Sequence, residues 1–533
     1  MLRAAISLLA RRPALAVLIL FFAGVAFSAL PSLVYGPPLP ALHDEYGYLF
    51  LGETFAQGRL TNPPPPGPPE FYATFHEFIT PRYEAKFPPG NGVALALGDW
   101  LGSPIIGIWL VNGLWAVALY WMLRAAAPPG WALAGAVAGM VGYGAMTYWS
   151  YSYWGGSVLA LGGALAFGGA LRLWRRRGHP LRAAAGAGVG CGIMALTRPL
   201  DGFIFALLPA ALILGRIFRD RPAIGKKLAA FLIPALLGVG LMLGYNQATT
   251  GSPLAFAHRR YDETYLPRVA LFVWQKPAPD PPGQPAWLAR YEDVFATNMS
   301  ADPLSARQYW ANVEKFAVEQ FKFLFPYWIW PLAALGVLGV FARGGPARLA
   351  LLSLLFIAIP LLTVRFYAFP HYIAAWTAPA LVLFIQGARR LAAWGHRRNG
   401  LPAAGSIALL ALALWPMAAT GFALSQSYPA WSSFPWVYDR EKLREDLADR
   451  AQATGHKQLA LVVYAADHDP HAEWVFNSPD PAAQDVLWLR ALGAARVPEL
   501  ARWFPGYDEW LVYVKANGQL DRSELIKLPP AEK

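Results

Sequence analysis

The stretch from residue 43 to residue 92 places titratable side chains on a constrained backbone in an otherwise apolar chain. It opens on Asp44 and Glu45, directly after the first long apolar run, and closes on Lys86, which Phe-Pro-Pro follows. A positioned carboxylate can take a proton from a hydroxyl group. An ammonium group beside two prolines, which fix the backbone, can be held against a phosphate. Because polar groups at a membrane boundary are costly, we expect chemistry in this stretch.

Each of these residues also has a purely structural interpretation. Asp44 and Glu45 are typical of an aqueous helix start after Pro40, where the helix dipole favours carboxylates. A lysine at a membrane interface commonly packs its alkyl stem and keeps its charge in water, which would account for Lys86. The residue types alone leave both interpretations open.

Other basic residues are candidates for binding an anion. Arg82 lies four residues before Lys86 and could add a second positive charge. Arg198, Arg365 and His371 follow apolar runs on the predicted outer side, where basic residues are scarce, so they need an anionic partner. That partner could be Asp201, another outer carboxylate or a lipid phosphate.

A third group of residues could form the wall of such a site. His76 and Glu77 have the side chains of a metal-binding or acid–base pair, but no further His or Cys follows at ligand spacing. We therefore expect His76, Glu77, Tyr83 and His371 as wall residues and predict no metal site. No glycine-rich phosphate loop or serine-nucleophile motif occurs in a strand–turn–helix setting, which argues against nucleotide hydrolysis and serine hydrolase chemistry.

The composition is typical of a membrane protein. Of its 533 residues, 56% are hydrophobic and 15% are charged, and the mean hydropathy is +0.32. A soluble protein of this size is less apolar, so we predict an all-α polytopic membrane protein. The net charge of +12 comes from short basic clusters between apolar runs. This is the positive-inside pattern, and it argues against a nucleic-acid partner.

A membrane span needs about 20 apolar residues, and the chain has about eleven such runs. The first is long for a signal peptide and is expected to stay as an anchor helix. With a cytoplasmic N-terminus, the basic clusters at 124, 172–182, 216–227, 343–348 and 389–398 all lie inside. The predicted spans are 13–35, 104–123, 131–148, 153–174, 182–197, 202–218, 227–247, 322–341, 348–364, 371–388 and 402–424.

This topology divides the chain into a membrane domain, 1–425, and a C-terminal domain, 426–533, on the outer side. The first outer loop, 36–103, is predicted to hold interfacial helices at 42–57 and 91–101, the first with Tyr46 and Phe50 toward lipid. The second, 248–321, has a proline-rich part at 277–285 and an amphipathic helix near 303–321. In the C-terminal domain we predict a small α/β fold with helices at 438–452 and 481–492 and strands at 459–464, 474–476 and 510–515.

The order of these features resembles the GT-C class of integral-membrane glycosyltransferases. It is most similar to bacterial relatives of the protein O-mannosyltransferases and of the aminoarabinose transferases. In that class an acidic motif follows the first span, as Asp44-Glu45 does, and a Lys-x-Pro-Pro turn closes the loop in several members, as Lys86 to Pro89 does. Further matching stretches include Phe75-His76-Glu77, Ser152 to Gly156, Leu271 to Gln275 and His471 to Asn477. Phe87 and Asn91 depart from the tyrosine and glutamine expected in the most similar members.

The resemblance implies sugar transfer from a polyprenyl-phosphate carrier to a lipid, glycan or protein acceptor on the periplasmic face of the bacterial inner membrane. Asp44 would be the general base of an inverting reaction, and Glu45 would orient the acceptor or help to hold a divalent cation. Members of the class differ in metal dependence, so the resemblance predicts no definite cofactor. Lys86 and Arg82, with Arg198 or Arg365, would stabilise the leaving phosphate.

Three other classes remain as alternatives. A flippase, polymerase or ligase for lipid-linked glycans also combines many spans with outer loops, but no acidic pair is expected directly after its first span. A secondary transporter would have inverted repeats and ionisable residues deep within its spans, whereas the polar residues here gather on one side. A binding subunit without catalysis is compatible with the sequence.

Overall fold

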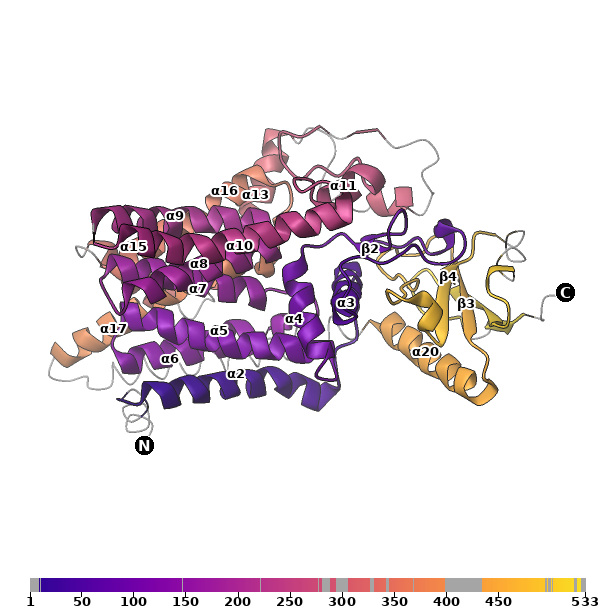
Figure 1. The fold of residues 1–533 in the computed structure, drawn as a ribbon, viewed down its shortest axis with the longest axis horizontal. Coiled ribbons are helices and arrows are strands. Elements are labelled where there is room, and N and C mark those ends of the chain that lie inside the picture. Colours follow the sequence, from indigo (N-terminus) through magenta and orange to yellow (C-terminus); the bar gives the residue numbers. More distant parts are fainter. Residues whose placement is uncertain are drawn as a thin grey trace.

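The computed structural model is mostly helical and has a small sheet region. Figure 1 shows a long helical bundle at one end and the main sheet with its helix α20 at the other, with α3 and β2 between them. The structure describes residues 9, 11–145, 147–220, 222–276, 278–279, 288–293, 305–325, 330–341, 345–367, 369–397, 434–493, 496, 500, 502–521 and 525–528.

Within the described residues, six helical segments are long and apolar enough to cross a membrane. Their lengths and hydropathies agree with the predicted spans that begin at 13, 104, 153, 202, 227 and 348. They are α2 (Pro13–Tyr35), α5 (Pro104–Ala126), α7 (Ser157–Trp174), α9 (Pro199–Arg219), α10 (Ile224–Thr250) and the segment Pro346–Thr363, made of α15 (Pro346–Leu355) and α16 (Ala358–Thr363).

Of the other predicted spans, the one at 182–197 is a continuous helix, α8 (Pro180–Thr197). The rest are less regular: α6 (Pro129–Gly139) passes into a π-helical turn, Met140–Ala145. The span predicted at 322–341 is interrupted, because α13 (Ala306–Leu324) covers its start and α14 (Trp330–Val337) its later part, before a 3-10 turn, Leu338–Phe341. Another 3-10 turn, Pro370–Trp376, precedes α17 (Thr377–Arg397). The span predicted at 402–424 and the domain boundary at 425 lie outside the described residues.

Proline and glycine organise the bundle. Helices α2, α5, α8, α9 and α15 each have proline in their first turn, where the missing N–H has no intrahelical partner to lose. Helices α8 and α10 approach closely at Gly192 and Gly238, where a Cβ on Gly238 would meet the Gly192 Cα at 2.3 Å. Small residues of this kind let membrane helices pack backbone to backbone.

The first outer segment folds against the rest of the protein. It contains α3 (His43–Ala56), a 3-10 turn, Pro69–Phe71, the hairpin strands β1 (Glu77–Phe78) and β2 (Glu84–Ala85), and α4 (Pro89–Asp99). The predicted helices at 42–57 and 91–101 are confirmed as helices. The predicted lipid-facing side of the first is wrong, because Phe50 is buried and the Tyr46 ring stacks on Phe476 at 3.8 Å.

The second outer segment contributes α11 (Ala257–Tyr265) and α13. Helix α13 confirms the amphipathic helix predicted near 303–321, and it begins with a capping box between Ser305 and Gln308. Most of the proline-rich part at 277–285 lies outside the described residues.

The C-terminal elements form a four-stranded sheet with strand order β4-β3-β5-β6. Strand β3 runs parallel to β4 and β5, and β6 is antiparallel to β5. The helix at 438–452 and the strands at 459–464 and 510–515 are confirmed within a few residues. The elements are α20 (Pro435–Thr454), β3 (Gln458–Tyr464), β4 (Val486–Arg490), β5 (Asp508–Val514) and β6 (Ile526–Lys527).

Two predictions for this region are wrong. Residues 481–492 hold a 3-10 turn, Pro481–Ala483, and strand β4 in place of a helix. The buried run from Val486 to Arg490 pairs with β3, and a short apolar run of this kind does not distinguish strand from helix by its sequence. Residues 474–476 belong to no strand of the described sheet, and their backbone groups bond to side chains, as described below.

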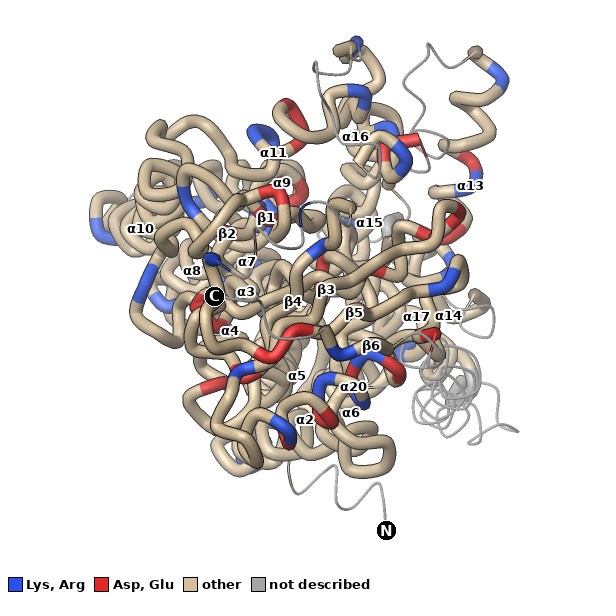
Figure 2. Tube along the Cα trace, turned by 90° about the vertical axis from the view of Figure 1, so that its right-hand side faces the viewer, with Lys and Arg blue, Asp and Glu red and all other residues tan. Residues whose placement is uncertain are grey.

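The sheet has two covered faces. On β3, Leu459 and Leu461 pack with aromatic residues of the first outer segment, while Ala460 and Val462 pack with α20. This alternation follows the two-residue period of a strand. Figure 2 looks onto the sheet, with α20 beside it and the bundle behind. The first outer segment is therefore fixed between the bundle and the C-terminal sheet.

Candidate active site

Asp44 lies in the first turn of α3, where the helix dipole favours a negative charge. Its Oδ2 atom is 3.6 Å from Nε2 of His76. The Asp44 side chain is 33% exposed, whereas the His76 side chain is only 4% exposed. Asp44 can therefore meet a solute from one side while the imidazole supports it from the other.

At the start of the hairpin, His76 has a backbone conformation that residues other than glycine rarely adopt. Its φ angle is +66°, its N–H donates to the Tyr261 hydroxyl at 2.9 Å, and its carbonyl accepts from the Lys86 N–H at 2.9 Å. These two bonds offset the cost of the left-handed conformation, which is often found at functional sites. They also place the Lys86 backbone directly opposite His76.

The electrostatics favour an ionised Asp44 beside a neutral His76. Burial alone raises the pKa of Asp44, but His76 and Lys86 outweigh it and hold that pKa well below its ordinary value. Burial and the repulsion of Lys86 lower the pKa of His76 to about 4, although Asp44 opposes this. At neutral pH the pair is a carboxylate and an uncharged imidazole.

Lys86 follows β2 and is 5% exposed. Its Nζ lies 3.3 Å from Oδ1 of Asp262 and 4.8 Å from the centre of the Tyr261 ring, both on α11. Burial would raise the pKa of Asp262, but Lys86 and His258 hold it below its ordinary value. The ammonium group is thus held in place by a carboxylate and an aromatic face.

Glu77 and Tyr83 are buried on the other side of the hairpin. Glu77 pairs with Ala85 across the ribbon, and successive residues of a strand point to opposite faces, so Glu77 points away from the face of Lys86. Burial raises the pKa of Glu77 well above its ordinary value, and the nearby Tyr83 hydroxyl offsets this only in part. Of the predicted wall residues, His76 therefore lies at Asp44, whereas Glu77 and Tyr83 form an uncharged pair on the opposite face of the hairpin.

Glu45 is directed into the protein. Its Oε2 atom accepts from the N–H groups of Ala41 at 2.9 Å and Leu42 at 3.3 Å, and its Oε1 accepts from the N–H of Tyr153 at 3.1 Å. Burial raises its pKa to about 7, although these three bonds lower it. The carboxyl group caps α3 and joins it to the loop before α7.

Arg198 lies between α8 and α9, close to the same site. Its Nε bonds to Asp201 Oδ2 at 2.6 Å, and its guanidinium lies 4.1 Å from the centre of the Tyr372 ring. Burial raises the pKa of the Tyr48 hydroxyl, while Arg198 lowers and Asp44 raises it. Asp44 and Arg198 are therefore both in electrostatic reach of one hydroxyl group on α3.

The remaining predicted site residues have other positions. His371 Nδ1 lies 2.8 Å from the Tyr148 hydroxyl, and its charge neighbours are Arg198 and Asp44. Arg365 follows α16 and donates to the carbonyl groups of Phe272 at 3.2 Å and Gln275 at 2.9 Å. It therefore holds the loop that follows α11. Arg82 is exposed. Burial raises the pKa of the neighbouring Glu84 to about 8, and the positive charge of Arg82 opposes this rise. Asp44, His76 and Lys86 lie together, and His371 is in electrostatic reach of both Asp44 and Arg198.

The C-terminal part adds a wall to this site. The His471 ring lies 5.8 Å from that of His43 and 5.9 Å from that of Tyr291. The His43 ring in turn lies 5.8 Å from that of His76. Residues 469–477, which we call the docking segment, thus reach the residue next to Asp44.

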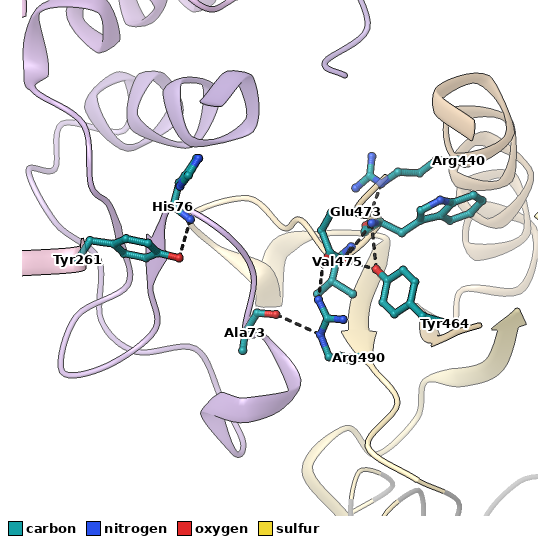
Figure 3. Close-up of polar contacts among 9 residues, drawn as sticks. Ala73, His76, Tyr261, Arg440, Tyr464, Glu473, Val475 and Arg490 are labelled. Atoms are coloured by element: carbon teal, nitrogen blue, oxygen red, sulfur yellow. Dashed lines mark hydrogen bonds and ion pairs between the residues drawn. The ribbon is translucent and has the colours of Figure 1, made fainter. Parts of the chain in front are cut away.

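A buried ion pair holds the docking segment, as Figure 3 shows. Arg490 of β4 pairs with Glu473, and the two side chains are 6% and 3% exposed. Glu473 also accepts from the N–H groups of Trp474 at 3.0 Å and Val475 at 2.9 Å. Nε of Arg490 reaches the carbonyl of Ala73 at 3.4 Å, in the first outer segment.

Several of these residues were not predicted as site residues. Tyr261 and Asp262 belong to the second outer segment, and 176 positions separate Asp262 from Lys86. His471, in a stretch that carries the family resemblance, is partly covered by His43 and Tyr291. His468, three residues earlier, is 8% exposed. Within the described part of the chain, no group of three or more His, Cys, Asp or Glu side chains is arranged to hold a metal ion.

Comparisons with known proteins identify the fold. No protein-family profile and no curated protein sequence matches the chain. Archaeal oligosaccharyltransferase AglB from Archaeoglobus fulgidus, with an inhibitory peptide and a dolichol-phosphate, is 12% identical over 93% of this chain and 69% of its own, with a TM-score of 0.45. Its apo form is 13% identical over the same shares, with a TM-score of 0.46.

The crystal structure of ArnT from Cupriavidus metallidurans, bound to undecaprenyl phosphate, matches over most of both chains. It is 14% identical, the match covers 94% of this chain and 92% of that chain, and the TM-score is 0.51. The chain therefore has the GT-C type of membrane-glycosyltransferase fold that the sequence resemblance predicted.

Proposed function

We propose that the chain transfers a sugar from a polyprenyl-phosphate carrier to an acceptor at the periplasmic face of the bacterial inner membrane. The observation that carries this proposal is Asp44, a part-exposed carboxylate with a depressed pKa beside the buried cation Lys86. The ArnT structure with the same fold holds undecaprenyl phosphate, which supports a lipid-linked donor. The acceptor is a lipid, a glycan or a protein with a free hydroxyl or amino group.

In the proposed reaction, Asp44 removes the proton from the acceptor as the acceptor oxygen or nitrogen attacks the anomeric carbon. The bond from that carbon to the phosphate oxygen breaks, its electron pair stays on the phosphate, and the configuration inverts. Asp44 needs position more than a raised pKa, because the leaving lipid phosphate is a stable anion. His76 is a positioning residue that keeps Asp44 ionised and oriented.

Lys86 and Arg198 are proposed to stabilise the phosphate as its negative charge grows. Each already has a carboxylate partner, Asp262 and Asp201, which holds the cation in place before the donor arrives. We propose a bracing role for Glu45 and Arg365, because both bond to backbone groups of neighbouring loops. Arg82 is exposed and is proposed to attract the anionic donor without touching it.

The proposed topology has about eleven spans, a cytoplasmic N-terminus, a membrane domain over 1–425 and a periplasmic domain over 426–533. The six long apolar helices and the basic clusters between them support it. Under this topology the hairpin, α11 and the sheet share the periplasmic side with Asp44.

Removal of the gene, followed by analysis of the envelope glycans and lipid-linked sugars, tests this function. A transferase predicts that one sugar disappears from its acceptor while the polyprenyl-phosphate sugar accumulates, and that only a chain with an active Asp44 restores it. Accumulation of a complete glycan on its carrier at the inner leaflet would instead indicate a flippase. Loss of long polymers with intact repeat units would indicate a polymerase.

Substitutions at Lys86 and Asp262 are expected to change donor affinity in opposite directions. Lys86→Met removes the proposed phosphate ligand and should weaken binding of the polyprenyl-phosphate sugar by about tenfold or more and slow turnover. Asp262→Asn frees the same ammonium group from its carboxylate and should tighten donor binding. Equilibrium binding of the donor to the purified full chain measures both effects. An unchanged donor affinity in Lys86→Met would exclude contact between Lys86 and the phosphate.

His76→Asn is expected to shift the pH dependence of kcat/KM. In the wild-type protein the low pKa of Asp44 keeps the base ionised, so the rate should stay level from about pH 7 down to about pH 5. Without His76, burial raises the pKa of Asp44, and the acid limb should move to higher pH. His179→Asn, which removes an exposed histidine before α8, is the control. If both variants keep the wild-type profile, His76 does not tune Asp44.

A further inference from the structure

A second polar site lies at the end of the bundle remote from Asp44. A cavity of about 160 Å³ is lined by the last turns of α7 and α9 and the first turns of α8 and α10. Helix α7 begins beside the loop that Glu45 holds and runs for 18 residues, a length of about 27 Å, to this cavity. The cavity is therefore separate from the candidate active site.

The lining of the cavity is strongly cationic. Five cationic side chains face one carboxylate, that of Asp220. Asp220 bonds to Arg176 and Arg216, each at 2.9 Å, so it is already shared by two of the five. The cations are Arg172, Arg176, Arg177, Arg216 and Lys227.

Several of these donors have bonding capacity left. Among the described residues, Arg177 has no ion pair or side-chain hydrogen bond, and Nε of Arg172 is buried without a hydrogen-bond partner. Helix α8 begins at Pro180 on the cavity wall, so its first N–H groups add partial positive charge. A set of cations with too few carboxylates around one cavity is stabilised when an anion occupies it.

The backbone around the cavity is strained. Three non-glycine residues of the described chain have a φ angle in the left-handed region, and one of them is His76 of the candidate active site. The other two are Arg176 (+52°), on the cavity wall, and Ala223 (+55°), whose carbonyl accepts from the N–H of Lys227. Such conformations are strained, and they concentrate at binding sites.

The positive-inside rule accounts for basic residues at this end of the bundle, and Arg176 and Arg177 are exposed as it expects, but it does not account for the direction of Arg216 and Lys227. Lysine and arginine side chains that only orient a membrane protein extend into water. The Arg216 side chain is 11% exposed and Lys227 is 8% exposed, and both face the cavity. Their burial indicates a site that was built into the fold.

The depth of the cavity fits a lipid headgroup. Trp174 and Phe218, at the ends of α7 and α9, are 39% and 58% exposed. Exposed aromatic residues at the ends of apolar helices mark the membrane–water interface. Basic pockets between helices at this level bind the headgroups of anionic lipids.

We propose that this cavity binds a phosphate group, either that of an anionic phospholipid at the membrane surface or free phosphate from solution. Arg172, Arg177 and Lys227 supply the donors, and Asp220 holds Arg176 and Arg216 at the rim. A bound phosphate would join the same four helix ends that a small hydrophobic cluster, including Leu173, Ala183 and Ile217, holds together, so it would add to the stability of this end of the bundle.

The purified full chain in nanodiscs of mixed phosphatidylcholine and phosphatidylglycerol tests the lipid source. Native mass spectrometry should find phosphatidylglycerol retained in preference to phosphatidylcholine. Arg177→Gln should lower that preference about fivefold, and the double variant with Lys227→Met about twentyfold or more. Arg219→Gln removes an exposed arginine of α9 that is outside the lining, and it should leave the preference unchanged.

Titration of the protein in phosphatidylcholine nanodiscs with inorganic phosphate tests the other source. Phosphate binding that Arg177→Gln weakens supports the site and assigns it to free phosphate, whereas retention of phosphatidylglycerol alone assigns it to lipid. Because Arg177 is exposed, its variant should keep the wild-type Tm without ligand, which excludes misfolding as the cause. Equal losses in Arg219→Gln, or no preference for either probe, would overturn the proposal.

Discussion

Asp44→Asn is expected to lower the rate of sugar transfer by about a hundredfold or more, the usual effect of removing a general base. Asparagine keeps the shape of the side chain but cannot take the acceptor proton. Because asparagine has the same size and shape, it leaves no cavity and causes no clash, so the variant should fold normally. Turnover of a polyprenyl-phosphate sugar and an acceptor by the purified chain measures the effect.

Donor binding separates this role from a structural one. Removing the negative charge of Asp44 leaves Lys86 less compensated, so the affinity for the donor phosphate should stay the same or rise while turnover falls. Asp44→Glu keeps a carboxylate one methylene further along and should retain part of the activity. A wild-type rate in Asp44→Asn would show that another group takes the proton.

Glu45→Gln is the matched control, because it alters the adjacent carboxylate. Glu45 accepts three backbone N–H bonds, so this variant is expected to lower the free energy of unfolding by about 1 to 3 kcal/mol. Its activity should fall only as far as its folded fraction falls. If Glu45→Gln instead lost turnover at full stability, Glu45 would act on the acceptor, as the sequence resemblance suggested.

The place of the candidate site could be predicted from the sequence, because its charged residues differ sharply from the apolar runs around them. Asp44 and Lys86 are charged residues beside apolar runs, and the segment between them is too polar and too rich in proline for a membrane helix. The long spans were predictable for the same reason, since length and hydropathy alone define them. Strands β3 and β5 likewise follow from runs of β-branched and aromatic residues.

The partners of these residues could not be predicted, because no local pattern encodes a distant contact. Asp262 lies 176 positions from Lys86, and its stretch of sequence shows only a polar helix. The lipid-facing side predicted for α3 was wrong for a related reason. Tyr46 is apolar at helical spacing, but the surface it meets is Phe476 of the C-terminal part and not lipid. Periodicity indicates that a face is buried without indicating what covers it.

Arg490→Met is expected to destabilise the C-terminal sheet by about 3 to 5 kcal/mol, because it leaves Glu473 charged, buried and without its cation. Trp474 and Trp488, whose ring centres are 5.9 Å apart, are buried neighbours of the pair in sequence and allow unfolding to be followed by fluorescence. Glu473→Gln in the same chain should restore part of the loss, since it removes the unpaired charge. Arg444→Met breaks an exposed pair with Glu441 and should cost less than about 1 kcal/mol.

The same variant shows whether the docking segment serves the reaction. His471 lies two residues before Glu473 and contacts His43, the residue next to Asp44. Loosening the segment should therefore raise the KM for the acceptor, which approaches Asp44, more than the KM for the donor, whose phosphate is expected at Lys86. Measurements below the unfolding temperature of Arg490→Met keep the chain folded, so an equal rise in both KM values would indicate general loss of structure. Unchanged KM values with lowered stability would make the C-terminal sheet a support for the first outer segment and no part of the acceptor site.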